Sequence, residues 1–136
     1  MKRGLSKGRF GGNQFEDLKM RNDKDNLILK MTFEFVLKII SLSEEVRQNN
    51  RLEMASQIFR CGTSIGTNIR EAQNAESKPD FIHKFKISAK EADELYYWLQ
   101  LCKKSEFYPT PDETLFEELN SIILITSKII FSSKKN

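Results

Sequence analysis

Apolar residues recur every three or four positions along four separate stretches of this 136-residue chain. In the stretch from Asp25 to Asn49 this spacing places the apolar side chains on one face of a helix. The predicted core positions are Ile28, Met31, Phe35, Ile39, Leu42 and Val46; Met54, Ile58, Cys61, Ile65, Ile69 and Ala72; Phe81, Phe85, Ala89, Ala92, Tyr96, Leu99 and Cys102; and Leu115, Leu119, Ile122, Thr126 and Ile129. No stretch needs a strand. Four helices of about 23 to 26 residues with short connections predict an all-α, antiparallel, up-down-up-down four-helix bundle about 35 Å long.

Polar residues and prolines mark the predicted helix boundaries. Asn50, with Glu53 three residues later, predicts an N-cap and its partner at the start of the second helix, which closes near Glu76. Residues 77–80 include a proline and predict the start of a third helix. Residues 110–113 predict the start of the fourth, with Thr110 as the N-cap and a proline at the first helical position.

Two glycines, Gly62 and Gly66, lie inside the second predicted helix. Each costs about 1 kcal/mol relative to alanine, so we expect a closely packed partner helix to offset the cost. Around Ser64 they also spell G-x-S-x-G, the nucleophile elbow of hydrolases. That elbow needs a preceding strand and a triad histidine, whereas here the preceding residues are helical and the single histidine is His83. The pattern therefore predicts neither a hydrolase nor a phosphate loop, since no Gly-Lys-Ser/Thr follows.

Metal and redox chemistry find little support in the residue types present. A di-metal bundle needs a Glu-x-x-His on each of two helices, which one histidine cannot supply. We expect no metal and no cofactor, and a surface or interhelix role for His83. Antiparallel pairing about Ser77 would separate Cys61 and Cys102 by about 13 Å, so both are predicted to be reduced and buried.

Positive charge is concentrated at the N-terminus. Residues 1–24 hold seven basic and three acidic residues, a formal +4, whereas the other 112 hold 15 and 16, about −1. We therefore divide the chain into a flexible basic arm, 1–24, and a bundle, 25–136. Such an arm is suited to following a phosphate backbone, or it is a solvated tail that aids solubility. No apolar run spans a membrane and the N-terminus has no signal-peptide core, which favours a cytoplasmic protein with no membrane partner.

Two predicted helices carry a second apolar row beside the core stripe. The rows are Leu29, Phe33, Val36 and Ile40 in the first helix and Phe116, Ile123 and Ile130 in the last. These rows make the apolar faces wider than one bundle interior usually requires, so we expect a further surface to cover them.

A polar row, Ser64, Asn68 and Glu71, follows one face of the second predicted helix near its core stripe. Buried polar groups need partners, and Glu94 and Arg70 are the candidates. The row is interpreted either as a hydrogen-bond network that fixes helix register or as a polar patch at an oligomer seam or ligand site.

Two sequence blocks point to a known family. Residues 64–72, SIGTNIREA, resemble the S-I-x-x-N-I-x-E signature of the bacterial four-helix-bundle family associated with intervening sequences in large-subunit ribosomal RNA genes. Phe81, residues 87–95 and residues 98–99 are similar to the family's second block, with Glu94 at its recurrent glutamate. The resemblance covers about residues 25 to 132. One departure is Ala72, where the family commonly has glycine.

The resemblance implies a homopentameric bundle with no established enzymatic activity. A related branch, the accessory variability determinant of diversity-generating retroelements, binds nucleic acid and a reverse transcriptase through a basic surface. The leading hypothesis is therefore a non-catalytic homo-oligomeric scaffold or accessory factor that binds RNA or DNA, and the alternative is a protein-protein interaction adaptor that ignores nucleic acid. The candidate nucleic-acid contacts are Lys2, Arg3, Lys7, Arg9, Lys84, Lys86, Lys90, Lys103 and Lys104.

Overall fold

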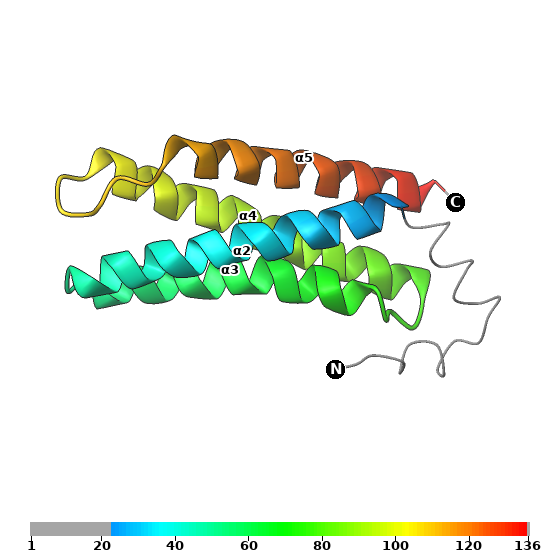
Figure 1. The fold of residues 1–136 in the computed structure, drawn as a ribbon. Helices are drawn as coiled ribbons and strands as arrows, with labels where there is room; N and C mark the ends of the chain where they lie inside the picture. The colour runs from blue at the N-terminus through cyan, green and yellow to red at the C-terminus, as the bar shows by residue number, and fades with distance from the viewer. Residues whose placement is uncertain (1–22, 136) are drawn as a thin grey trace.

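The structure is a computed structural model that describes residues 23–135, with side chains from residue 27 onward. The described chain forms four helices and no strand: α2 (Asp23–Gln48), α3 (Leu52–Ala72), α4 (Lys78–Lys104) and α5 (Glu113–Lys134). They run up-down-up-down, and α5 returns to pack on α2, so that each helix contacts two neighbours (Figure 1). This arrangement confirms the predicted fold class. Four of the candidate contacts, Lys2, Arg3, Lys7 and Arg9, lie outside the described residues.

The core follows the predicted stripes closely. Every predicted position on α3 and α5 is buried, and on α2 the exception is Met31, which is half-buried. On α4 the prediction was partly wrong. Leu95 and Ser88 are buried, whereas the predicted core residues Phe81, Ala89 and Tyr96 are only half-buried. The buried face of α4 is thus rotated toward α3, because α4 packs against both α3 and α5 and the larger contact determines its orientation.

The turn between α2 and α3 corrects the predicted N-cap at Asn50. Its φ of 64° is left-handed, a conformation that asparagine tolerates better than most residues. The amide of Asn50 donates to the Arg47 carbonyl at 2.9 Å and that of Arg51 to the Val46 carbonyl at 3.2 Å, the Schellman pattern of a helix C-terminus. Asn50 therefore ends α2, and the residue preceding α3 is Arg51, which makes no side-chain cap.

The other helix boundaries give a mixed outcome. Helix α4 begins within the proline-containing segment, as predicted, and Ser77 caps it by accepting from the Asp80 amide at 3.2 Å. The predicted cap at Thr110 was wrong, since Asp112 caps α5 by accepting from the Thr114 amide at 2.9 Å. Helix α3 ends at Ala72, four residues before the predicted Glu76. At the start of α5, the Asp112 carboxylate is as good an N-cap as the Thr110 hydroxyl, so both residues are suited to begin this helix.

The two glycines of α3 lie where this helix meets α2. A Cβ added at Gly62 would come within 2.5 Å of Ile39 Cγ2, and one at Gly66 within 3.2 Å of Val36 Cγ2. The predicted close approach is therefore confirmed, and Gly62 is its tightest point. Within the described residues, none of the helices has the length and apolar content that crossing a membrane requires.

Candidate functional site

The predicted polar row divides into separate contacts. Asn68 Nδ2 donates to the carbonyl and hydroxyl oxygens of Ser64, at 2.9 and 3.1 Å, within α3. Glu71 instead pairs across the helices with Lys84, at 2.9 Å. Glu94 lies further along α4 and meets neither, so the four signature residues do not form one network among the described hydrogen bonds. Arg70, the other suggested partner, is exposed.

A second cluster forms where Glu94 lies, around an arginine that the sequence analysis did not single out. Arg60 reaches from α3 to α4 and pairs with Glu91 at 3.0 Å and with Glu94 at 2.5 Å. Trp98 Nε1 also donates to Glu94, at 3.1 Å, which holds that carboxylate in place. Arg60 precedes Ser64 by one helical turn, so extending the polar row backward was the signal that would have found it.

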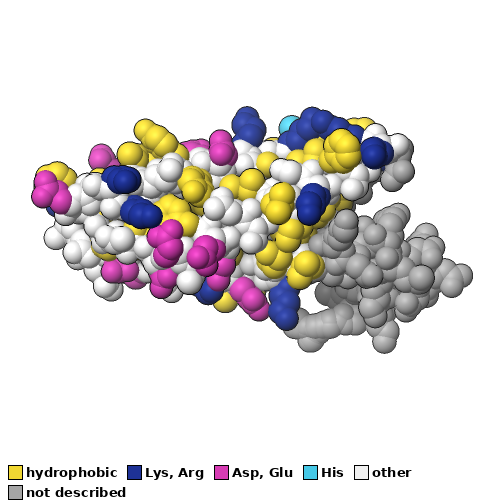
Figure 2. All heavy atoms as spheres, turned by 90° about the horizontal axis from the view of Figure 1, so that it is seen from above, with side chains coloured by type: hydrophobic (Ala, Val, Ile, Leu, Met, Phe, Trp, Pro, Cys, Tyr) yellow, Lys and Arg dark blue, Asp and Glu magenta, His cyan; other side chains and the backbone are white. Residues whose placement is uncertain are grey.

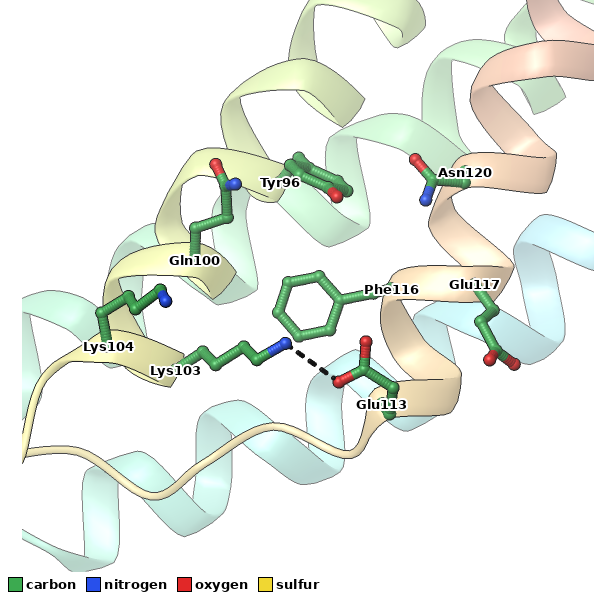
Figure 3. Close-up of a pocket in the computed structure, with 8 residues that line it drawn as sticks. All are labelled: Tyr96, Gln100, Lys103, Lys104, Glu113, Phe116, Glu117 and Asn120. Carbon is green, nitrogen blue, oxygen red and sulfur yellow. Dashed lines mark hydrogen bonds and ion pairs between the residues drawn. The ribbon is translucent and has the colours of Figure 1, made fainter.

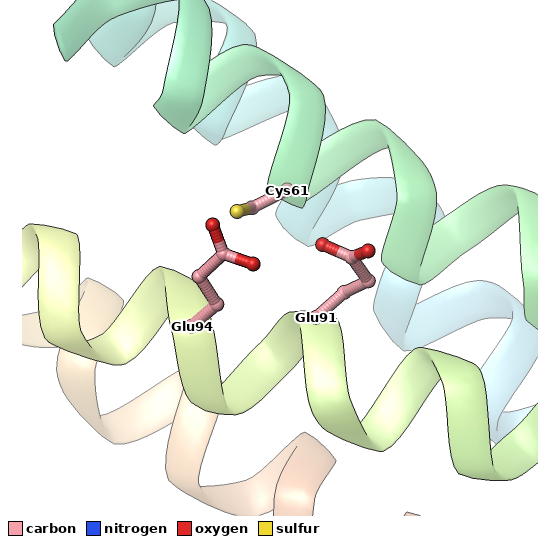
Figure 4. Close-up of side chains that lie close together, drawn as sticks. All are labelled: Cys61, Glu91 and Glu94. Atoms are coloured by element: carbon pink, nitrogen blue, oxygen red, sulfur yellow. The ribbon is translucent and has the colours of Figure 1, made fainter.

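Cys61 completes this cluster from the buried side. Its Sγ and one carboxylate oxygen each of Glu91 and Glu94 lie within 4.8 Å of one another (Figure 4). Thiolate and carboxylate are zinc ligands, but the Arg60 guanidinium already contacts all three groups, with Nη2 at 3.3 Å from the sulfur. The positive charge that a metal ion would supply is thus supplied by Arg60. The arrangement serves as a cross-link between α3 and α4.

The two cysteines are free and buried, as predicted. Burial raises the pKa of Cys61 to about 12, although Arg60 opposes the shift, and burial raises the pKa of Cys102 to about 11. Since the thiolate is the reactive form, both side chains are held in the unreactive state at neutral pH. His83 lies on the exposed side of α4, in agreement with its predicted surface position.

The described candidate lysines differ in whether they are free to meet a phosphate. Lys84 is paired with Glu71, and Lys103 pairs with Glu113 at 3.2 Å while lying over the Phe116 ring. Lys86, Lys90 and Lys104 are exposed, and no ion pair engages them in the described part of the chain. The structure therefore places the free positive charge of α4 on its solvent face.

A shallow pocket lies between α4 and α5 at the end where Lys103 sits. Lys103 and Glu113 close one side of it with their ion pair, and the Phe116 ring forms its floor beside Tyr96 (Figure 3). Gln100, Lys104, Glu117 and Asn120 complete the wall. The lining includes no serine, threonine, cysteine or histidine, so the pocket offers no set of nucleophile and base.

Several large apolar side chains of the described residues are exposed, and two groups of them each form an apolar face; the others are Leu27, Leu52, Tyr97, Leu101 and Phe107. The α2–α3 apolar face consists of Phe33, Leu37, Ile40 and Phe59. Its three α2 residues share a stripe beside Val36, which meets Gly66, and Phe59 lies two helical turns before Gly66 on α3. The α5 apolar face consists of Leu124 and Phe131, bordered by half-buried Ile123 and Ile130. Figure 2 views the bundle from the side of α5 and shows exposed hydrophobic side chains in its right half, where the C-terminal half of α5 lies in Figure 1.

The second apolar rows are therefore only partly as predicted. Phe33 and Ile40 are exposed, with Phe33 at 67%, and Leu29 and Val36 are half-buried. Phe116 is a correction, since it is 5% exposed and packs edge-on against Tyr96 with ring centroids 5.6 Å apart. The aromatic ring of Phe116 is therefore buried within the single bundle, between α4 and α5, and needs no second subunit to cover it.

These features define a class: a four-helix bundle with a packed core, polar cross-links between helices and exposed apolar flanks. The chain belongs to the 23S rRNA-intervening sequence protein family, whose model matches residues 24–132. Its fold is similar to the crystal structure of a protein of unknown function from the S23 ribosomal protein family of Bacteroides thetaiotaomicron. The two share 38% identity with a TM-score of 0.74, over 79% of this chain and 97% of that one. A search of the curated proteins finds no match.

Proposed function

We propose that this protein is a non-catalytic, homo-oligomeric bundle that acts as a nucleic-acid-binding scaffold or accessory factor in the cytoplasm. The observation that supports homo-oligomeric assembly is the presence of two exposed apolar faces, the α2–α3 apolar face and the α5 apolar face, on different helices. A ring is built when one patch of each subunit contacts a different patch of the next, and a pentamer is one such closed assembly. Large apolar side chains that are exposed on a single subunit are typical of interaction sites.

Two observations support nucleic acid as the partner. Lys86, Lys90 and Lys104 present positive charge on the solvent face of α4 without an ion pair to neutralise it in the described residues. The family description also ties this group of proteins to ribosomal RNA genes. A protein partner docked on the apolar faces is the second candidate function, favoured by the same exposed side chains.

The assembly is tested by native mass spectrometry and light scattering at micromolar concentration. We expect particles several times the 15.9 kDa chain mass, with five copies as the specific expectation. Phe33→Glu should reduce the mass to that of the single chain, because it places a charge in the α2–α3 apolar face. The matched control is Phe107→Glu, a phenylalanine exposed to a similar degree, 65%, in the loop before α5. A wild-type mass of one chain would contradict the assembly.

Nucleic-acid binding is tested by fluorescence anisotropy with labelled single-stranded RNA and duplex DNA across a salt series. Binding that weakens linearly with the logarithm of salt concentration is expected, because each phosphate contact releases counterions. If neither probe binds even at low salt, the adaptor function replaces the nucleic-acid function. The oligomeric mass is recorded on the same samples, so that a loss of assembly is not mistaken for a loss of the site.

A further inference from the structure

The fold separates charges that the sequence mixes. A plane across the bundle passes near three contacts: Ile39 with Gly62, Arg60 with Glu91, and Lys38 with Glu118. On one side lie residues 27–38, 63–90 and 120–135, which we name the basic end. On the other side lie residues 39–62 and 91–119, which we name the acidic end.

The two ends carry opposite net charges of equal size. The basic end holds ten lysine and arginine residues against four acidic ones, a formal +6, and the acidic end holds five against eleven, a formal −6. Figure 2 shows one face, where most Asp and Glu side chains lie toward one end and in the middle with a few Lys and Arg side chains among them, while the largest group of Lys and Arg side chains lies at the other end. Residues 27–135 are thus neutral in sum, but their positive and negative charges are concentrated at opposite ends of the bundle.

The local charge, rather than the sum, decides where a polyanion binds. Electrostatic interactions between exposed charges fade over about 8 Å at physiological salt, whereas the bundle is several times longer than that. A phosphate at the basic end is therefore attracted by the excess of lysines there, whereas a phosphate at the acidic end is repelled by the excess of carboxylates.

Helix α4 runs from the basic end to the acidic end, and one of its faces is exposed to solvent at both. Lys86 and Lys104 are 18 residues apart, which is five helical turns and about 27 Å, so both lie on the same side of the helix. Lys86 has Lys90 one turn away, whereas Lys104 adjoins Lys103, which Glu113 already neutralises. Identical side chains on one helix thus lie in opposite electrostatic surroundings.

We propose that the RNA phosphate backbone contacts the bundle at its basic end, through Lys86 and Lys90 with Lys78 and Lys134, and that the acidic end takes no part. This inference rests on the proposed function and narrows it to one end of the fold. It removes Lys103 and Lys104 from the candidate contacts. The C-terminus of α5 brings Lys134 and Lys135 to the same end as the start of α4 (Figure 1).

The test compares two double variants of the full chain, Lys86→Ala/Lys90→Ala and Lys103→Ala/Lys104→Ala, which remove the same charge from the same helix. Affinity for fluorescein-labelled single-stranded RNA of mixed sequence is measured across salt, with circular dichroism and oligomeric mass as checks on folding. The first variant should bind about 10- to 30-fold more weakly at 0.1 M salt, with a salt slope shallower by about 1.4. The second should match the wild type in both affinity and slope.

The outcomes separate the inference from the function on which it rests. Equal weakening by both double variants, or no weakening by either while the wild type binds RNA, overturns the assignment to the basic end and leaves the proposed function standing. A wild-type chain that shows no salt-dependent RNA binding overturns both. Weakening by the Lys103→Ala/Lys104→Ala variant alone would place the contacts at the acidic end and also overturn the inference.

Discussion

Helix α3 meets its two neighbours through opposite chemistry. Toward α2 it presents Gly62 and Gly66, and the two helices approach until Ile39 lies where a side chain would be. Toward α4 it presents polar groups, among them Arg60 and the Ile65 carbonyl, which accepts from the buried Ser88 hydroxyl at 3.0 Å. Both neighbours contribute buried apolar side chains to the core, and the contact with α4 adds these directional polar contacts.

The difference shows how a simple bundle acquires a unique arrangement. Apolar packing stabilises association in proportion to the area buried but distinguishes weakly between neighbouring registers. Hydrogen bonds and ion pairs add little net free energy, yet they are satisfied in only one register. The close approach at Gly62 should thus act mainly on stability, and the hydrogen bonds and ion pairs between α3 and α4 mainly on the register of these two helices.

The largest effect on the free energy of unfolding is expected for a substitution at Gly62. Gly62→Ala should destabilise the protein by about 2 kcal/mol in urea unfolding, because overpacking against Ile39 exceeds the gain in helix propensity. Gly66→Ala is the matched control and should be close to neutral, since its nearest contact at 3.2 Å leaves room for a small shift. A stabilised Gly62→Ala variant would show that the close approach is not needed.

Ser88→Ala should cost about 1 kcal/mol by removing the buried hydrogen bond between α4 and α3. The comparison variant is Ser43→Ala, because Ser43 is also buried but donates only to the Ile40 carbonyl of its own helix, at 2.9 Å. Equal effects in chemical denaturation would mean that the bond between helices contributes nothing beyond the one within a helix.

Arg60→Ala should lower the free energy of unfolding by less than Ser88→Ala does. A double-mutant cycle with Glu94→Gln should give a coupling free energy of about 0.5 to 1 kcal/mol between the two side chains. The Arg60 side chain is 47% exposed, so solvent weakens the pair. Repeating the cycle at high salt should reduce the coupling. A coupling that does not change with salt would point to packing of the arginine stem rather than to charge.

The last effect is absent at neutral pH and appears only in alkaline solution. Burial raises the pKa of Cys61 to about 12 and that of Cys102 to about 11, above the ordinary value of 9.0. The contribution of the neutral thiols to stability is therefore complete below pH 9 and is lost as pH rises, since the unfolded chain ionises first. Between pH 8 and 11, the midpoint temperature of thermal unfolding should fall more steeply with pH for the wild type than for the Cys61→Ala/Cys102→Ala variant. Parallel curves would contradict these shifts.

Much of the bundle was predictable because a helical period of 3.6 residues turns an apolar spacing directly into a buried face. The stripes on α3 and α5 needed no knowledge of the partners. The boundaries were harder, since Asn50 is suited to both a helix start and a left-handed helix end, and its place in the Schellman turn depends on where α2 stops. Leu95 and Ser88 were missed because α4 divides its contact between two helices.

The polar contacts of α3 could be predicted within that helix but not between helices. Asn68 and Ser64 are one turn apart on a single helix, so their bond follows from the sequence. Glu71 and Glu94 reach across to other elements, and which cation each meets depends on the stagger of α3 against α4. That stagger brings Lys84 to Glu71 and Arg60 to Glu94.

The sequence by itself determined the four helices of the described residues 23–135, most of their core faces and the family, because these depend on local spacing and on short motifs. Only the tertiary structure decided the closest approach at Gly62, the pairing of Arg60 and the separation of charge into two ends. Each of these depends on residues far apart in the chain becoming neighbours. A net charge summed along the sequence contains no information about position, whereas four antiparallel helices bring 27–38, 63–90 and 120–135 to one end.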